Sequence, residues 1–269
     1  MESFQTSDGL MLRYVIDDFT DPWRMADTVL LVHAAMGSSR RFLQWVPHLA
    51  RDFRVVRLDA RGHGESDPHG SEPITFDRMV QDVAELLDHL GVAKVHIAGS
   101  SAGAYISQGY TARNPSRVST LGCFAATAGM KTGKVDYASW VARIGRDGLA
   151  KFLRDTIADR VDLSRASPGF VDWFVTESAR TSIPTLARLV PVMGAQDLTK
   201  ELATIRCPML AVAPGADPLH TVEEYAALQR IVPHCEFVVF DGLPHNITDA
   251  EPDRCAKELH RFLMKHVGR

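Results

Sequence analysis

The chain has 269 residues, of which 45% are hydrophobic and 23% charged, a composition typical of one large globular domain rather than of a disordered chain. Its 30 Lys and Arg against 33 Asp and Glu give a formal net charge of −3, which argues against nucleic acid or an anionic membrane surface as a partner. The four cysteines are scattered and no apolar run reaches the roughly 18 residues of a membrane span, so zinc modules, disulfide scaffolds and membrane proteins are excluded.

Short apolar runs alternate with longer segments of helical periodicity along the chain. We expect residues 1–20 to form an antiparallel strand or hairpin that leads into a sheet. Six later runs are almost continuously apolar, as expected for strands that are covered on both faces of a parallel sheet. These predicted strands are Val29–Val32, Phe53–Leu58, Val95–Ala98, Val118–Phe124, Met209–Ala213 and Phe237–Phe240.

Helices are predicted between these strands. Apolar residues recur at helical spacing over residues 79–90, where Thr75 can cap the start and Gly91 follows the end. Further helices are expected over Ala102–Arg113 and Pro252–Val267. The alternation of strands and helices predicts an α/β fold with a doubly wound, mostly parallel sheet.

The alternation stops between about Thr127 and Arg206. This stretch has no convincing strand, and its apolar residues recur in a helical pattern. We therefore interpret residues 128–204 as a helical cap that is inserted into the fold. Residues 1–127 and 205–269 would form the core domain.

The strongest chemical signal is a serine framed by two glycines. Gly99-Ser100-Ser101-Ala102-Gly103 directly follows a predicted strand and directly precedes a predicted helix. This is the context of a nucleophile elbow, in which a crowded strand-to-helix turn needs small residues on both sides of the serine. Ser101 is therefore the candidate nucleophile. Ser100 lies outside the glycine frame and is assigned to the lining of the substrate pocket.

A nucleophilic serine needs a base, and the base needs a group that orients it. His245 follows the last predicted strand, and Asp217 lies in the turn after the strand before it. Loops at the carboxyl ends of parallel strands gather at one edge of a sheet, where Ser101 is also expected. We therefore assign His245 as the base and Asp217 as the acid. Asp241 and Asp249 are the competing acids, but both are so close to His245 in sequence that local loop capping explains them more simply.

Two backbone N–H groups are expected to stabilise an oxyanion. One belongs to Ala102, directly after the candidate nucleophile, and the other to Ala35 in the loop that follows the first predicted parallel strand. His33, in the same loop, is interpreted as a structural hydrogen-bonding residue.

At this point the chain resembles serine hydrolases of the α/β-hydrolase superfamily over nearly its whole length. Besides the elbow, residues 58–67 are similar to the D-x-R-G-H-G-x-S turn of that family. The resemblance implies an α/β-hydrolase fold with an inserted helical cap, the triad order Ser–Asp–His, and structural roles for Arg61 and His63, which would bond backbone. The nearest likeness is to the 3-oxoadipate enol-lactonase and small carboxylesterase group. Ala34 and Ala104 stand where the family usually has glycine. Neither change removes a catalytic group, so they bear on which substrate is bound and not on the reaction.

Three functions remain open. The first is hydrolysis of a small carboxylic ester or lactone through an acyl-enzyme on Ser101. The second is hydrolysis of a C–C bond in a β-diketone-like substrate, which the same residues can support and which would release a ketone and an acid. The third is a ligand receptor without turnover, since some plant hormone receptors resemble this fold and keep a triad.

The cap is expected to select the substrate. Trp140 and Trp173 are candidates for the wall of an apolar pocket. A cap arginine could bind a substrate carboxylate, and the candidates are Arg143, Arg146, Arg180 and Arg188.

We expect no metal or organic cofactor, since the triad chemistry requires none. The start of the chain lacks the basic and apolar regions of a secretory signal, which predicts a cytoplasmic location. The expected partner is a small-molecule substrate, without nucleic acid or membrane. The oligomeric state stays open, with a homodimer as one alternative.

Overall fold

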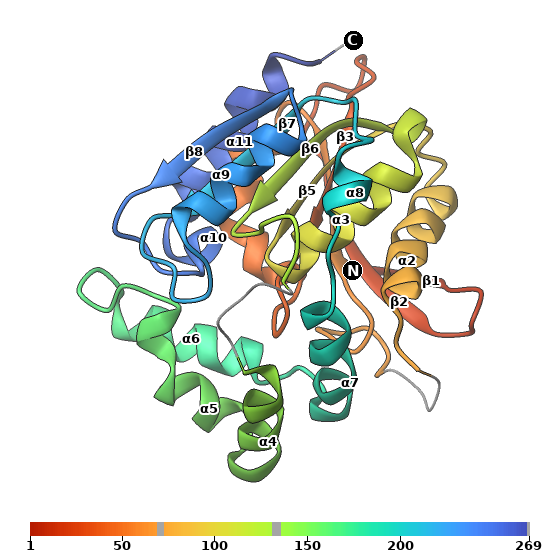
Figure 1. Cartoon of the computed structure of the whole chain (residues 1–269). Helices are drawn as coiled ribbons and strands as arrows, with labels where there is room; N and C mark the ends of the chain where they lie inside the picture. Colours follow the sequence, from red (N-terminus) through yellow and green to blue (C-terminus); the bar gives the residue numbers. More distant parts are fainter. Residues whose placement is uncertain (69–72, 131–135, 268–269) are drawn as a thin grey trace.

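The computed structural model describes residues 1–68, 73–130 and 136–267 (Figure 1). Residues 131–135 of the predicted cap and the last two residues of the predicted core lie outside the described residues. The architecture is built on an eight-stranded sheet with the order β1-β2-β4-β3-β5-β6-β7-β8. The predicted α/β architecture with a mostly parallel sheet is confirmed.

Strands β3 to β8 pair parallel with one another, and β2 pairs antiparallel with both β1 and β4. The expected N-terminal hairpin is therefore present. The six predicted parallel strands are confirmed, and their ends differ from the prediction by at most two residues. The strands are β1 (Glu2–Gln5), β2 (Met11–Asp17), β3 (Thr28–Val32), β4 (Arg54–Asp59), β5 (Val95–Ser100), β6 (Val118–Phe124), β7 (Met209–Pro214) and β8 (Cys235–Phe240).

The helices follow the strands as expected. Thr75 caps α2 by accepting a hydrogen bond from the N–H of Arg78, which matches the predicted start. The helices and short 3-10 turns are η1 (Ser39–Trp45), α1 (Val46–Leu49), α2 (Phe76–His89), α3 (Ala102–Arg113), η2 (Pro115–Arg117), α4 (Tyr137–Asp147), α5 (Leu149–Asp155), η3 (Ile157–Asp159), α6 (Pro168–Ser178), α7 (Ile183–Gly194), α8 (Thr199–Leu202), α9 (Val222–Ile231), α10 (Ile247–Ala250) and α11 (Pro252–Met264).

The sheet buries apolar side chains on both faces. Along β3, Leu30 and Val32 pack into one core cluster with residues of α2, α3 and α9, whereas Val29 and Leu31 pack into a second cluster with residues of η1, α1 and α11. All four side chains are at most 1% exposed. This two-sided burial explains why the parallel strands are apolar without alternation.

The chain between β6 and β7 forms helices α4 to α8 in its described part. Figure 1 shows α4, α5, α6 and α7 grouped at one end of the sheet, below it in that view. Buried residues of these helices, among them Ile144, Phe152 and Leu189, belong to the same core cluster as the residues of α2 and α3. The helical segment is thus packed onto the rest of the fold.

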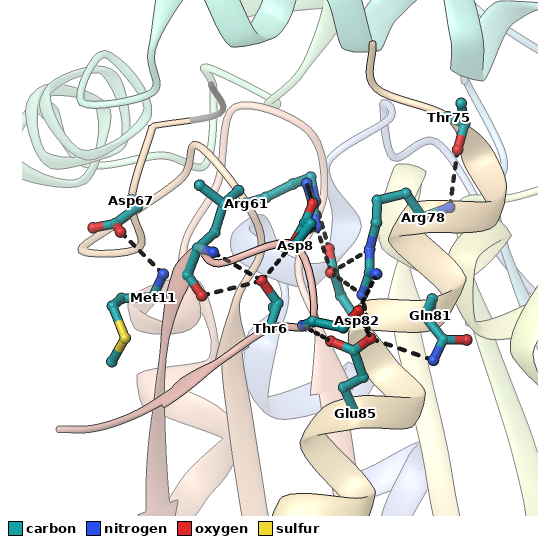
Figure 2. Close-up of polar contacts among 12 residues, drawn as sticks. Thr6, Asp8, Met11, Arg61, Asp67, Thr75, Arg78, Gln81, Asp82 and Glu85 are labelled. Carbon is teal, nitrogen blue, oxygen red and sulfur yellow. Dashed lines mark hydrogen bonds and ion pairs between the residues drawn. The ribbon is translucent and has the colours of Figure 1, made fainter. Parts of the chain in front are cut away.

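The turn that resembles the D-x-R-G-H-G-x-S motif is fixed by hydrogen bonds. The ring of His63 contacts the carbonyl oxygen of Arg61 at 2.9 Å, as the resemblance implies. The guanidinium of Arg61, which is 1% exposed, donates to both carboxylate oxygens of Asp82 at 2.6 Å and to Asp8 at 3.0 Å (Figure 2). Arg61 thus ties the turn to α2 through the carboxylate of Asp82, a contact that the resemblance did not imply.

Over the described ranges, no helix is long and apolar enough to cross a membrane.

Candidate active site

Ser101 stands on the sharp turn between β5 and α3. Its φ of 48° and ψ of −118° lie outside the regions that most residues adopt, and its N–H donates to the carbonyl oxygen of Phe124 at 2.8 Å. A Cβ on Gly99 would lie 2.4 Å from the carbonyl carbon of Gly103, and a Cβ on Gly103 would lie 2.2 Å from the carbonyl oxygen of Val32. Both glycines are therefore required by close backbone packing, as the elbow motif predicts.

The structure brings Ser101, His245 and Asp217 together. With its proton on Nδ1, His245 donates to Oδ2 of Asp217 at 2.7 Å, and its Nε2 accepts from the hydroxyl of Ser101 at 3.0 Å. His245 is 7% exposed and the side chain of Asp217 is fully buried. This is the geometry in which a histidine can take a proton from a serine while a carboxylate stabilises the imidazolium.

Asp217 is held as a carboxylate by several donors. Burial by itself would raise the pKa of Asp217, but the nearby charge of His245 and hydrogen bonds from His245, Tyr225 and the N–H of Leu219 lower it below its usual value. The N–H of Leu219 donates to Oδ1 at 2.8 Å, and the hydroxyl of Tyr225 donates to Oδ2. The acid thus stays charged where it faces the imidazole.

The two predicted oxyanion donors lie beside Ser101. Ala102 is the first residue of α3, so its N–H has no partner within the helix. The N–H of Ala35 donates no hydrogen bond within the described ranges, and both alanines line the same cavity as Ser101. His33 holds this loop, because one ring nitrogen contacts the carbonyl oxygen of Ala34 at 2.7 Å and the other accepts from a backbone N–H of the β4 turn at 3.0 Å.

The cavity above Ser101 is mainly apolar. Trp140 lines it, as predicted, and so do Ala34, Met36, Met130, Leu189, Val190, Met193 and Leu219. Three polar side chains besides Ser101 and His245 also line it: Tyr137, Arg160 and Asn246. The hydroxyl of Tyr137 is buried and has no hydrogen-bond partner within the described part of the chain.

Arg160 is the cation of this cavity. It is 9% exposed, and its guanidinium lies 5.4 Å from the ring centre of Trp140 and 5.6 Å from that of Phe152. Its Nε donates to the hydroxyl of Thr156 at 3.3 Å, and no carboxylate lies within ion-pair distance in the described ranges. Burial and the nearby charge of Arg41 lower the pKa of Arg160 to about 10. A buried guanidinium without a carboxylate partner is costly, and an anionic ligand would offset that cost.

The arginines that the sequence singled out lie elsewhere. Arg143 pairs with Asp155 at 3.6 Å, and Arg188 is exposed. Arg146 pairs with Asp147 and Arg180 with Glu65 and Glu177. Arg143 lines a second hollow next to the Ser101 cavity, together with Arg160 and His245. Of these arginines and Arg160, only Arg160 lines the cavity of Ser101 itself in the described part of the chain.

Two predicted pocket residues are also placed elsewhere. Ser100 is 3% exposed, and its hydroxyl bonds to that of Thr248 at 2.9 Å inside the fold. Ser100 is the last residue of β5, and the turn at Ser101 directs only the next side chain into the cavity. Trp173 lines a separate hollow with Arg40, Leu43 and Phe170.

Asp249 has a different partner from the loop contacts that were expected. Arg41 from η1 binds its carboxylate with two nitrogens, one of them 2.6 Å from Oδ2. Both side chains are at most 5% exposed. A third nitrogen of Arg41 donates to the hydroxyl of Ser178 at 2.8 Å, at the end of α6. Asp249 therefore forms a buried ion pair with Arg41. Capping of the local loop accounts for only part of its contacts.

The comparison with known proteins agrees with this geometry. A family model described as alpha/beta hydrolase fold matches residues 27–252. The chain belongs to the α/β-hydrolase family. Within the described ranges of this α/β-hydrolase, no group of three or more His, Cys, Asp or Glu side chains could hold a metal ion.

Relatives of this α/β-hydrolase include lactonases and other hydrolases. It is 27% identical over 209 residues to 3-oxoadipate enol-lactonase 1 of Acinetobacter baylyi, covering 74% of this chain and 75% of the relative. It is 34% identical over 107 residues to a 2-hydroxy-6-oxononadienedioate/2-hydroxy-6-oxononatrienedioate hydrolase of Pseudomonas putida, covering 38% of this chain and 37% of the relative. The crystal structure of the enol-lactonase from Burkholderia xenovorans has the same fold, with a TM-score of 0.87, 20% identity and coverage of 98% and 100% of the two chains. The chain is thus an enzyme of the α/β-hydrolase family, and the proteins to which it is similar include enol-lactonases.

Proposed function

We propose that the enzyme hydrolyses a small carboxylic ester or lactone that carries a carboxylate, through an acyl-enzyme on Ser101. The observation that carries this proposal is the bridge of His245 between Ser101 and Asp217 at the floor of an apolar cavity that also contains Arg160. The predicted cap, residues 128–204, would contribute Arg160 and Trp140 to that cavity and so select the substrate.

The geometry supports the following steps. Ser101 Oγ attacks the carbonyl carbon while its proton passes to Nε2 of His245, and the negative oxygen accepts from the N–H groups of Ala35 and Ala102. The imidazolium, stabilised by Asp217, then returns the proton to the departing alkoxide as the C–O bond breaks. A water molecule attacks the acyl group with His245 again as base, which releases the acid and restores Ser101.

Arg160 supports the choice of an anionic substrate. Its side chain is buried and lines the same cavity as His245, and the carbonyl oxygen of Arg160 accepts at 3.0 Å from the N–H of Asn246, the residue after His245. A carboxylate can accept two parallel hydrogen bonds from a guanidinium, which fixes the orientation of the substrate as well as its affinity. The names of the relatives, which include a 3-oxoadipate enol-lactonase, are in keeping with an acidic substrate.

A substitution of Arg160 tests this part of the proposal. Arg160→Met keeps most of the side-chain bulk and removes the charge. We expect KM for a p-nitrophenyl ester of a dicarboxylic acid to rise about 10- to 100-fold, since a charged hydrogen bond is worth about 1.5–3 kcal/mol. KM for p-nitrophenyl butyrate should stay within about twofold.

Arg146→Met is the matched control, because Arg146 is exposed and pairs with Asp147 outside the cavity. It should leave KM unchanged for both esters. Equal increases in KM for the anionic and the neutral ester in Arg160→Met would contradict recognition of a carboxylate.

A second candidate is hydrolysis of a C–C bond in a β-diketone-like substrate. It is favoured by the similarity to the 2-hydroxy-6-oxononadienedioate/2-hydroxy-6-oxononatrienedioate hydrolase, although that match spans only 38% of the chain. The same three side chains would serve both reactions. Product analysis separates them, because C–C cleavage yields a ketone and an acid, whereas ester cleavage yields an alcohol and an acid.

A further inference from the structure

Asp217 has a hydrogen-bond partner that the proposed reaction does not use. The hydroxyl of Tyr225 donates to Oδ2 of Asp217, the same oxygen that accepts from Nδ1 of His245. Tyr225 is 1% exposed and the side chain of Asp217 is fully buried, so the contact is shielded from bulk solvent. One carboxylate oxygen is therefore shared between the imidazole and a phenol.

The local sequence explains why Tyr225 reaches Asp217. The turn after β7 ends at Thr221, which forms a capping box with Glu224: the hydroxyl of Thr221 accepts from the N–H of Glu224 at 3.2 Å, and Glu224 accepts from the N–H of Thr221 at 2.7 Å. This cap fixes the first turn of α9. Tyr225 and Leu228 are the buried residues of that helix, so its inward face presents the phenol to Asp217.

Several other groups surround the phenol. The ring of His220 packs edge-on against it at 5.7 Å between centres, and Glu224 and Tyr105 lie close enough to act on its charge. Burial first, and then the negative charge of Asp217, raise the pKa of Tyr225 well above its usual value. The phenol therefore keeps its proton and acts as a donor at neutral pH.

We propose that Tyr225 is a positioning residue that fixes Asp217 and limits how strongly this carboxylate attracts the proton of His245; the inference rests on the proposed function of the Ser101 site. Two donors that share one oxygen weaken each other, because each withdraws negative charge from it. The phenol bond is strongest while His245 is neutral. It therefore favours the neutral imidazole, which is the form that can accept the proton of Ser101.

The test is an imidazole NMR titration of His245 in the wild type and in Tyr225→Phe, which removes only the hydroxyl. The His245 signal is assigned by its absence in His245→Gln. We expect the midpoint of the His245 titration to move to higher pH by about half a unit or more in Tyr225→Phe. The acid limb of kcat/KM for p-nitrophenyl butyrate should move in the same direction.

Tyr105→Phe is the matched control. Tyr105 is a buried tyrosine whose hydroxyl bonds to Thr127 at 3.0 Å, so the variant also loses a buried phenol bond but no contact with Asp217. Its His245 titration should match the wild type. In a background of Asp217→Asn, Tyr225→Phe should cause no further shift.

An unchanged His245 midpoint in Tyr225→Phe would overturn the proposal, and so would an equal shift in Tyr105→Phe or a shift that persists in the Asp217→Asn background. The NMR titration does not depend on turnover. If Ser101→Ala kept the esterase activity, the proposed function would fail, whereas the effect of Tyr225 on His245 would still be decided by the titration.

Discussion

Ser101→Ala should lower kcat for p-nitrophenyl butyrate by about a thousandfold or more, because the acyl-enzyme can no longer form. The hydroxyl of Ser101 contacts Nε2 of His245, and its removal leaves the rest of the cavity in place. The remaining rate would come from the oxyanion donors and from substrate binding alone. Steady-state kinetics with enzyme of known concentration measures the change.

Ser100→Ala is the control for this substitution. Ser100 is the adjacent serine, but its hydroxyl bonds to Thr248 inside the fold instead of facing the cavity. The Ser100→Ala enzyme should keep kcat within a few-fold of the wild type. A Ser101→Ala enzyme that keeps more than about a tenth of the activity would be incompatible with a serine nucleophile at this position.

Asp249→Ala should strongly lower the thermal stability of the enzyme. Unlike Ser101→Ala, it does not change the nucleophile. The substitution leaves the guanidinium of Arg41 buried without its carboxylate partner. Removal of one member of a buried ion pair costs about 3–5 kcal/mol, which corresponds to a decrease of about 6–20 °C in the thermal midpoint of a chain of this size. Thermal unfolding followed by circular dichroism gives the midpoint.

Asp253→Ala provides the comparison for Asp249→Ala. The side chain of Asp253 is 71% exposed, and its one ion-pair partner within the described ranges is the ring of His48, at 2.8 Å. Its loss should leave the midpoint nearly unchanged, because exposed pairs contribute little. Equal thermal midpoints for the two variants would contradict the expectation that breaking the buried Arg41–Asp249 pair is costly.

The parallel part of the fold could be predicted because a strand that is buried on both faces appears in the sequence as a nearly continuous apolar run. The runs of β3 to β7 are mainly apolar and buried on both faces, and glycines or polar turns follow most of them, whereas the edge strand β8 is only partly buried. The positions of Ser101, Asp217 and His245 could be inferred for a related reason. Each follows the carboxyl end of a parallel strand, and such ends meet at one edge of a sheet.

The remaining features depend on contacts between distant segments. The residues around Arg160 in the sequence do not show that it lines the cavity. Its place there arises only when the helical segment packs above Ser101. The same holds for Arg41, whose partner Asp249 is 208 positions further along the chain. Tyr225 was within reach of sequence reasoning, since the capping box at Thr221 and its spacing of eight residues from Asp217 are visible in the sequence. The spacing alone, however, does not show which way the phenol points.

The central claim is that Ser101 is activated by His245, and a fluorophosphonate tests it most directly, because the reagent reacts with activated serines and needs no knowledge of the substrate. Intact-mass analysis would be run on the wild type, Ser101→Ala and Ser100→Ala. We predict one adduct on the wild type and on Ser100→Ala, and none on Ser101→Ala. An adduct that persists on Ser101→Ala, or a wild type that stays unlabelled, would contradict the assignment.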